Sequence, residues 1–198
     1  MKVIGIVGLI SSGKSTVGKI LEQYGCEVLN LDQMSHEVYK KGSDSYLKII
    51  NIWGEDILDS NKQISRKSLS EKVFIDDENE ILKLENIVWP NLTNNLKKRL
   101  ADLKNEDLVF IEGAKILNSN FIQYCDKVWC IVSSIENIKN RILSTSKNHK
   151  NLLQRLKNQI NEYSYLTGVD EFIENNSTRQ ELENVVKLLL EKNKEGPI

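Results

Sequence analysis

A nine-residue segment near the N-terminus has the glycines, the lysine and the hydroxyl groups of a phosphate-binding loop. The segment Gly8-Leu9-Ile10-Ser11-Ser12-Gly13-Lys14-Ser15-Thr16 fits the pattern G-x-x-x-x-G-K-S/T at every fixed position. In such a loop the backbone N–H groups surround the phosphates of a nucleotide, and the positive end of the following helix faces the same phosphates. The residues expected to bind the donor nucleotide are Ser11, Ser12, Gly13, Lys14, Ser15 and Thr16.

Two side chains of this segment have chemistry of their own. The Lys14 ammonium can reach the β- and γ-phosphates, and the Ser15 hydroxyl can ligate Mg²⁺. The alternative is a chance match in a glycine turn. The context argues against chance, because the apolar run of residues 3–7 precedes the loop and a helix-like segment follows it. The sequence therefore predicts a nucleotide site with Ser15 as the metal ligand.

Asp32 and Arg141 are two further residues that could act on a phosphoryl group. A carboxylate at position 32, at the end of a predicted strand, could accept the proton of a substrate hydroxyl as it attacks the γ-phosphate. Its alternative role is an N-cap of the following helix. The Arg141 guanidinium lies near a polar, basic segment that could close over the nucleotide, or else on a solvated helix face. We expect Lys14, Asp32 and Arg141 to be the catalytic residues.

Three other residues have less distinctive chemistry. Glu112 ends a predicted strand, where it could hold Mg²⁺ through a water or be an ordinary loop carboxylate. We interpret His36 as a surface or helix-packing histidine. Trp89 is interpreted as packing in the core or beside the substrate.

The segments that must position these residues alternate between strands and helices. Near-continuous apolar runs predict five strands, at residues 2–7, 27–30, 108–111, 127–132 and 171–173. Such strands, separated by helices, indicate a three-layer αβα fold with a five-stranded parallel sheet covered on both faces. Ligands in such folds bind at the carboxyl ends of the strands, which places the phosphate loop, Asp32 and Glu112 along one crevice.

The middle of the chain is predicted to be helical. Residues 35–103 have apolar positions at helical spacing, with candidate N-caps at Ser43 and Ser65. Pro90 is expected to break one helix or to begin the next. We expect a single domain over residues 1–198, with a core at about 1–34 and 106–198, a helical substrate subdomain at about 35–105 and a lid at about 141–160.

The composition limits the classes of partner and the compartment. With a net charge of −1 the chain has no global field to attract nucleic acid or an anionic membrane, so we expect a small-molecule substrate. We expect no targeting signal, and no apolar run in the sequence approaches membrane-spanning length. Cys26, Cys125 and Cys130 have neither disulfide nor zinc-site spacing, and we expect structural thiols in a reducing cytoplasm. The oligomeric state is not predicted.

Residues 1 to about 190 resemble the dephospho-CoA kinase family, which are phosphate-loop kinases of the nucleoside-monophosphate-kinase type. Because many families share the loop, the specific matches lie elsewhere in the chain. They are Val28-Leu29-Asn30-Leu31-Asp32 followed by His36, the segments 54–58, 64–69 and 72–74, the segment 84–90, the lid positions Arg141, Arg155 and Gln159, and the pair Asn175-Asn176.

The resemblance implies an enzyme of coenzyme A biosynthesis. Its reaction would be the ATP- and Mg²⁺-dependent phosphorylation of the ribose 3′-hydroxyl of dephospho-CoA. On this resemblance Asp32 aligns with the proposed catalytic base and Arg141 with a lid arginine. The helical middle region would hold the pantetheine end of the substrate, and Asn175-Asn176 would lie near the adenine.

The sequence departs from the family pattern mainly on the side of the acceptor. Trp89 and Thr93 replace a histidine and an arginine, and residues 112–118 match almost nothing. Leu9 and Ser11 stand where the family favours glycines, and Asn30 replaces an aspartate. Two alternatives therefore stay open: a kinase of the same scaffold acting on another nucleoside or nucleotide, and an ATP-binding paralogue that has lost catalysis.

Overall fold

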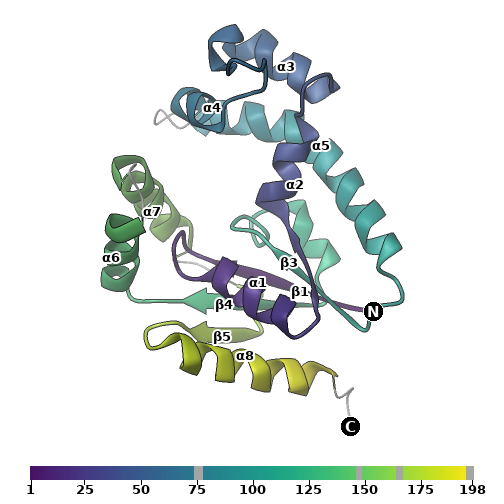
Figure 1. Ribbon diagram of the computed structural model, residues 1–198, viewed down its shortest axis with the longest axis vertical. Helices are drawn as coiled ribbons and strands as arrows, with labels where there is room; N and C mark the ends of the chain where they lie inside the picture. The colour runs from purple at the N-terminus through teal and green to yellow at the C-terminus, as the bar shows by residue number, and fades with distance from the viewer. Residues whose placement is uncertain (74–77, 146–148, 164–166, 195–198) are drawn as a thin grey trace. The chain divides into compact units, whose positions relative to one another are not determined.

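Five parallel strands form one sheet, in the order β2-β3-β1-β4-β5 (Figure 1). The structure is a computed structural model, and it describes residues 1–73, 78–145, 149–163 and 167–194. The strands are β1 (Lys2–Gly8), β2 (Glu27–Asn30), β3 (Leu108–Glu112), β4 (Lys127–Val132) and β5 (Glu171–Glu174). Every neighbouring pair is parallel. The predicted five-stranded parallel sheet is confirmed, and the bounds differ from those predicted only at the last residue of β1, β3 and β5.

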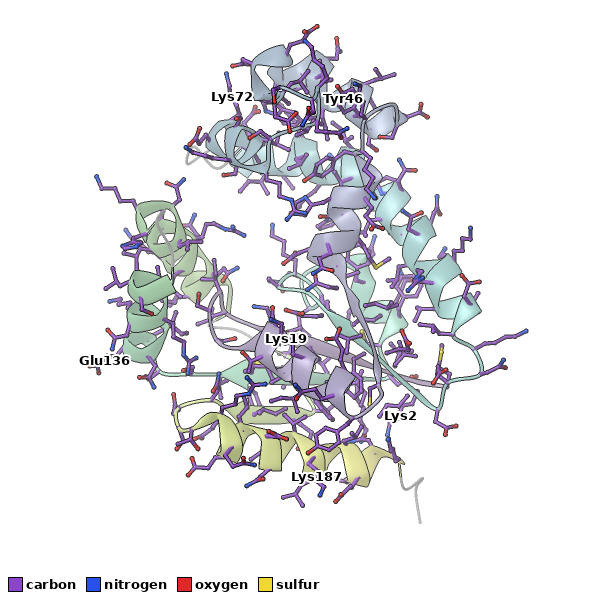
Figure 2. The ribbon with its side chains drawn as sticks, in the orientation of Figure 1. Lys2, Lys19, Tyr46, Lys72, Glu136 and Lys187 are labelled. Atoms are coloured by element: carbon purple, nitrogen blue, oxygen red, sulfur yellow. The ribbon has the colours of Figure 1, made fainter. Side chains whose placement is uncertain are left out.

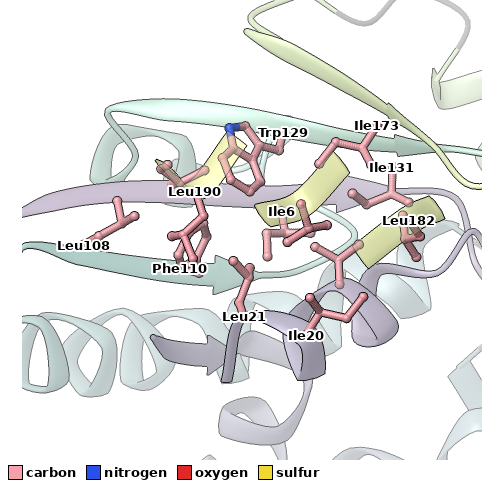
Figure 3. Close-up of a cluster of buried hydrophobic side chains, with 13 residues drawn as sticks. Ile6, Ile20, Leu21, Leu108, Phe110, Trp129, Ile131, Ile173, Leu182 and Leu190 are labelled. Atoms are coloured by element: carbon pink, nitrogen blue, oxygen red, sulfur yellow. The ribbon is translucent and has the colours of Figure 1, made fainter. Parts of the chain in front are cut away.

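One face of the sheet packs against α1 (Lys14–Gln23) and α8 (Arg179–Lys194) (Figure 3). The buried cluster between them includes Ile6, Ile20, Leu21, Phe110, Trp129, Ile131 and Leu182. Because β1 and β3 are apolar at nearly every position, both of their faces are buried, as expected for a parallel sheet. The buried strands fix the position of the loop that follows β1.

A second apolar cluster joins α6 (Ile135–Thr145) to α7 (His149–Tyr163). Its buried residues are Ile138, Ile142 and Leu156. Leu9 and Ile10 of the phosphate loop pack against it. The loop is therefore held by apolar contacts to the helices that lie in the predicted lid region.

The chain divides into two compact units, residues 1–30 with 104–198 and residues 31–103. The first unit contains the sheet, α1, α6, α7, α8 and a 3₁₀ turn at Asn120–Tyr124. The second contains α2 (Leu31–Val38), α3 (Asp44–Trp53), a 3₁₀ turn at Glu55–Ile57, α4 (Arg66–Val73) and α5 (Glu78–Asp102). The division falls a few residues from the predicted subdomain bounds because α2 packs against α5.

Side-chain hydrogen bonds begin two helices of the second unit. Ser43 Oγ accepts from the Tyr46 N–H across 3.1 Å, and Ser65 Oγ accepts from the Ser68 N–H across 3.2 Å. Both serines were predicted N-caps, and both predictions are confirmed. Tyr46, labelled in Figure 2, also donates its hydroxyl to the Lys62 carbonyl across 2.6 Å. This bond ties α3 to the turn that precedes α4.

The start of α2 differs from the prediction. The helix begins at Leu31, not near Ser35, so Asp32 lies in its first turn. The Ser35 hydroxyl donates to the Asp32 carbonyl across 2.8 Å. The early start buries Leu31 and Val38 on one side of α2, and this side packs within the helical unit.

Pro90 is the second correction, because it lies inside α5 and does not end a helix. Val88, Leu92 and Leu96 are all buried, so one apolar stripe continues across the proline. Their burial outweighs the ~3 kcal/mol that a proline costs in a helix interior. Although α5 has 25 residues, neither it nor any other helix in the described part of the chain is apolar enough over its length to span a bilayer.

Candidate functional site

The loop between β1 and α1 requires its two fixed glycines. Gly8 and Gly13 have φ of 149° and 115°, which L side chains rarely adopt. A Cβ on Gly8 would lie 2.5 Å from the Ile131 carbonyl oxygen, and a Cβ on Gly13 would lie 2.1 Å from Asn175 Nδ2. Gly13 is also the N-cap residue of α1 and has no side chain to cap the first-turn amides. The positive end of α1 is thus left for an anion.

Lys14 lies across the start of the loop. Its Nζ donates to the carbonyl oxygens of Gly8 and Leu9, across 2.9 and 3.0 Å. Phosphate oxygens of a nucleotide in the loop would compete with these two carbonyl oxygens for the Lys14 ammonium. The geometry is consistent with the predicted role of Lys14.

Ser15 and Asn30 both contact Glu112 at the end of β3. The Ser15 hydroxyl donates to Glu112 Oε1 across 2.6 Å, and Asn30 Nδ2 donates to Glu112 Oε2 across 2.8 Å. Glu112 is only 7% exposed, so its carboxylate depends on these two donors. The structure therefore brings the predicted metal ligand Ser15 together with the acidic residue whose role the sequence left open.

This pair of oxygen-bearing side chains fits a magnesium ion. Mg²⁺ prefers hard oxygen ligands and usually keeps several waters and substrate phosphates in its shell. Among the described residues no group of three or more His, Cys, Asp or Glu side chains could hold a metal alone. Ser15 and Glu112 would thus supply the protein's part, and the phosphates and waters would supply the rest.

Arg141 of α6 binds the backbone of the phosphate loop. Its Nη1 donates to the carbonyls of Ser11 and Ser12, across 3.2 and 3.0 Å, and its Nη2 donates to the Asn175 carbonyl across 2.6 Å. The predicted catalytic arginine therefore lies directly beside the loop. Its guanidinium joins three segments, namely α6, the loop and the end of β5.

Asn175 is a loop-binding residue that sequence reasoning placed only near the adenine. It is 8% exposed, and its Nδ2 donates to the Ser12 carbonyl across 2.7 Å. The Ser12 N–H donates to the Leu9 carbonyl and its hydroxyl is fully buried, so Ser12 shapes the loop from inside. The sequence feature that could have predicted this contact is a polar residue directly after the last strand, at the edge of the sheet where the phosphate loop lies.

Gln159 of α7 makes a polar contact with the loop. Its Oε1 accepts from the Ile10 N–H across 2.7 Å, beside the apolar packing of Leu9 and Ile10. Arg155, on the same helix, is exposed. Of the segment between α6 and α7, residues 146–148 of the predicted lid lie outside the described residues.

Asp32 belongs to the helical unit, whereas the phosphate loop belongs to the sheet unit. The carboxylate is exposed in the first turn of α2, directly after β2 in the chain. It favours the protonated form of His36, one turn along α2, although burial lowers the pKa of that histidine overall. Asp32 is thus accessible to a substrate.

The family model described as dephospho-CoA kinase matches residues 2–181. The chain belongs to the dephospho-CoA kinase family. It is 33% identical over 181 residues to a dephospho-CoA kinase from Fusobacterium nucleatum, which covers 91% of this chain and 92% of that one. It is 29% identical to a dephospho-CoA kinase from Aquifex aeolicus, with 96% and 97% coverage.

Solved structures share the fold of this dephospho-CoA kinase family member. A dephospho-CoA kinase from Campylobacter jejuni aligns with a TM-score of 0.65 at 22% identity, covering 98% of both chains. The protein TT1252 from Thermus thermophilus aligns with a TM-score of 0.75 at 23% identity, covering 96% of this chain and 97% of that one. The fold prediction is confirmed.

Membership of the dephospho-CoA kinase family makes the protein an enzyme, a transferase that uses ATP as co-substrate and acts in coenzyme A biosynthesis. The resemblance read from the sequence is therefore confirmed. The two alternatives, a kinase with another acceptor and a paralogue without catalysis, are not favoured by these matches.

Proposed function

We propose that the protein transfers the γ-phosphoryl group of ATP to the ribose 3′-hydroxyl of dephospho-CoA, giving coenzyme A. The observation that carries the proposal is the family match over residues 2–181, which spans the phosphate loop, Asp32 and Arg141 together. The unit of residues 31–103 is proposed as the acceptor-binding subdomain, and the region of residues 141–160 as the lid. A cytoplasmic location stays a prediction.

The phosphate loop holds the donor in this proposal. In this proposal the N–H groups at Gly13, Lys14 and Ser15 face the phosphates from the start of α1, while the Thr16 N–H donates to the Gly13 carbonyl across 3.0 Å. Lys14 exchanges its two loop carbonyls for β- and γ-phosphate oxygens. Because Arg141 and Asn175 already hold the carbonyl side of the loop, the loop keeps its shape while the donor binds.

Ser15 would hold a magnesium ion directly, and Glu112 would hold it through a water. When bound, the ion neutralises negative charge on the β- and γ-phosphates. The Ser15 hydroxyl already donates its hydrogen bond to Glu112 Oε1 across 2.6 Å, which leaves an oxygen lone pair that could ligate the ion.

Asp32 orients the acceptor hydroxyl and takes its proton as the bond to phosphorus forms. The transition state of phosphoryl transfer is loose, so positioning the hydroxyl matters as much as removing its proton. Among the described residues, no hydrogen bond is found from a first-turn amide of α2 to the Asp32 carboxylate. The exposed carboxylate therefore has no capping role that would compete with the acceptor hydroxyl. Arg141 stabilises the charge of the transferring group from the side of the loop.

The test offers the purified protein ATP and Mg²⁺ with dephospho-CoA or with a panel of nucleosides and nucleoside monophosphates. We expect ADP release with dephospho-CoA, and a product that carries a new 3′-phosphate by phosphorus NMR. Release with another acceptor alone would replace the substrate in this proposal. ATP binding without turnover on any acceptor would contradict the proposed reaction.

A further inference from the structure

The phosphate loop contains a tight turn whose third residue, Ser11, has an unusual backbone. The Ser12 N–H donates to the Leu9 carbonyl across 3.1 Å, which closes a four-residue β-turn. Ser11 has a φ of 58°, in the left-handed region that glycine enters without steric cost. A serine is strained in this conformation, so the turn needs contacts from outside the loop to keep its shape.

Two helices hold the peptide groups on either side of Ser11. Gln159 Oε1, on α7, accepts from the Ile10 N–H across 2.7 Å. Arg141 Nη1, on α6, donates to the Ser11 carbonyl across 3.2 Å. One contact therefore holds the chain as it enters the turn, and the other holds it directly after the strained residue.

Apolar packing keeps α7 against the same part of the loop. Leu9 and Ile10 pack against the cluster that contains Leu156, which is 2% exposed and lies three residues before Gln159 on α7. Burial of apolar side chains is not directional, so it brings the helix and the loop together without selecting the orientation of a peptide group. The hydrogen bond from the Ile10 N–H to Gln159 has a direction and can select it.

We propose that Gln159 is a positioning residue of the donor site, which keeps the turn at Ser11 in the conformation that binds the phosphates of ATP. The inference rests on the proposed function of the loop as the donor site. Gln159 acts through the Ile10 N–H and needs no contact with the nucleotide. Without this bond the strained turn relaxes, and the amides that follow, at Gly13 and Lys14, no longer converge on the phosphates. Because Gln159 lies in the region proposed as the lid, the same bond couples that region to the donor.

The test compares Gln159→Met with the wild-type protein. Methionine has a similar length and packs in a similar way, but it has no amide oxygen to accept the Ile10 N–H. Loss of one hydrogen bond that favours the binding conformation should raise the Kd for ATP about threefold to tenfold, by calorimetry without acceptor. The KM for ATP should rise by the same factor. The KM for dephospho-CoA and the melting temperature should stay close to the wild-type values.

Gln154→Met is the matched control. Gln154 is an exposed glutamine on the same helix, and its amide donates to Asn158 across 3.3 Å. Its replacement should leave the Kd for ATP unchanged. An equal rise in the Kd for Gln154→Met would overturn the proposal, because the effect would then belong to any glutamine of α7.

Ser11→Gly tests whether Gln159 acts through the turn. Glycine adopts a φ of 58° without strain, so the turn no longer depends on the bond to Gln159. In the Ser11→Gly background, Gln159→Met should therefore raise the Kd for ATP by less than about twofold. An equal loss in both backgrounds would overturn the proposal, because the two residues would then act independently.

The binding measurements separate this inference from the proposed reaction. Weaker ATP binding by Gln159→Met, relieved by Ser11→Gly, supports the inference even if the wild type transfers no phosphoryl group to dephospho-CoA. That lack of transfer would overturn the proposed reaction alone. Equal ATP affinity in Gln159→Met and the wild type overturns the positioning role, whatever the turnover. Absence of ATP binding to the wild type overturns both.

Discussion

The Ser15 hydroxyl lies 2.6 Å from Glu112 Oε1, and this contact joins the first turn of α1 to the end of β3. Glu112→Gln keeps the side-chain shape but removes the charge that orients Ser15 toward the metal. Residues behind a metal ligand typically change metal affinity by about 10- to 100-fold. We expect the Mg²⁺ concentration for half-maximal ADP release to rise by this factor, while nucleotide affinity without Mg²⁺ changes little. An unchanged Mg²⁺ dependence would exclude Glu112 from the metal site.

Asn30→Asp tests whether the fold requires a neutral hydrogen-bond donor beside the Glu112 carboxylate. Asn30 Nδ2 donates to Glu112 Oε2 across 2.8 Å, so an aspartate would place a second carboxylate against a buried one. We expect a loss of about 2–4 kcal/mol in the free energy of unfolding at neutral pH. Protonation of one of the two carboxylates would remove the repulsion, so the loss should be smaller at acidic pH than at neutral pH.

Urea unfolding at neutral and acidic pH measures this effect. Asn30→Ala is the control, because it removes the donor without adding a charge and should give a loss that depends little on pH. Equal losses for Asn30→Asp at both pH values would show that the two carboxylates do not interact.

Comparing Gly13→Ala with Gly25→Ala distinguishes two effects of an added Cβ. One is the loss of stability that backbone strain causes, and the other is the loss of ATP binding that a steric clash in the phosphate loop causes. Both glycines have positive φ, 115° and 77°, so an alanine is strained at either place by about 1–2 kcal/mol. A Cβ at position 25 has no atom within 4 Å, whereas at position 13 it meets Asn175 Nδ2. We expect both variants to lose some stability but only Gly13→Ala to lose ATP binding, by titration with a fluorescent nucleotide. Full ATP affinity in Gly13→Ala would contradict the described loop.

The thiols of Cys125 and Cys130 are predicted to be unreactive in the folded protein. Burial raises the pKa of Cys125 to about 12 and that of Cys130 to about 11. At about pH 8 their thiolate fraction is then at least a hundredfold below that of a free cysteine, and alkylation by iodoacetamide should slow by this factor. Mass spectrometry of the native and urea-unfolded protein measures it. Rapid native labelling of Cys130 would contradict its burial.

Local patterns in the sequence were sufficient for the sheet and for the phosphate loop. Apolar runs mark β1 and β3 because both faces of those strands are buried, and the glycine spacing marks the loop because Gly8 and Gly13 have no room for a Cβ. The N-caps Ser43 and Ser65 were found for the same reason, since a cap bonds within three residues of itself.

Contacts between distant segments could not be predicted in this way. The bond from Asn175 to Ser12 joins residues 163 positions apart, and the bond from Ser15 to Glu112 joins residues 97 apart. Pro90 was misplaced because the packing that keeps α5 continuous comes from other helices of its unit. Local helix propensity identifies Pro90 as a helix breaker, but it does not show the burial of apolar side chains on either side that outweighs this cost.

Turnover by Asp32→Asn tests the central claim most directly, namely that the carboxylate at position 32 acts on the acceptor hydroxyl while the phosphate loop holds ATP. Asp44→Asn is the control, because Asp44 is also an exposed aspartate in the first turn of a helix of the same unit. With dephospho-CoA and ATP saturating, we predict that Asp32→Asn lowers kcat by about 10²- to 10⁴-fold and leaves the KM for ATP nearly unchanged, while Asp44→Asn keeps full turnover. Wild-type kcat in Asp32→Asn would contradict the claim and leave Asp32 only a role in stabilising α2.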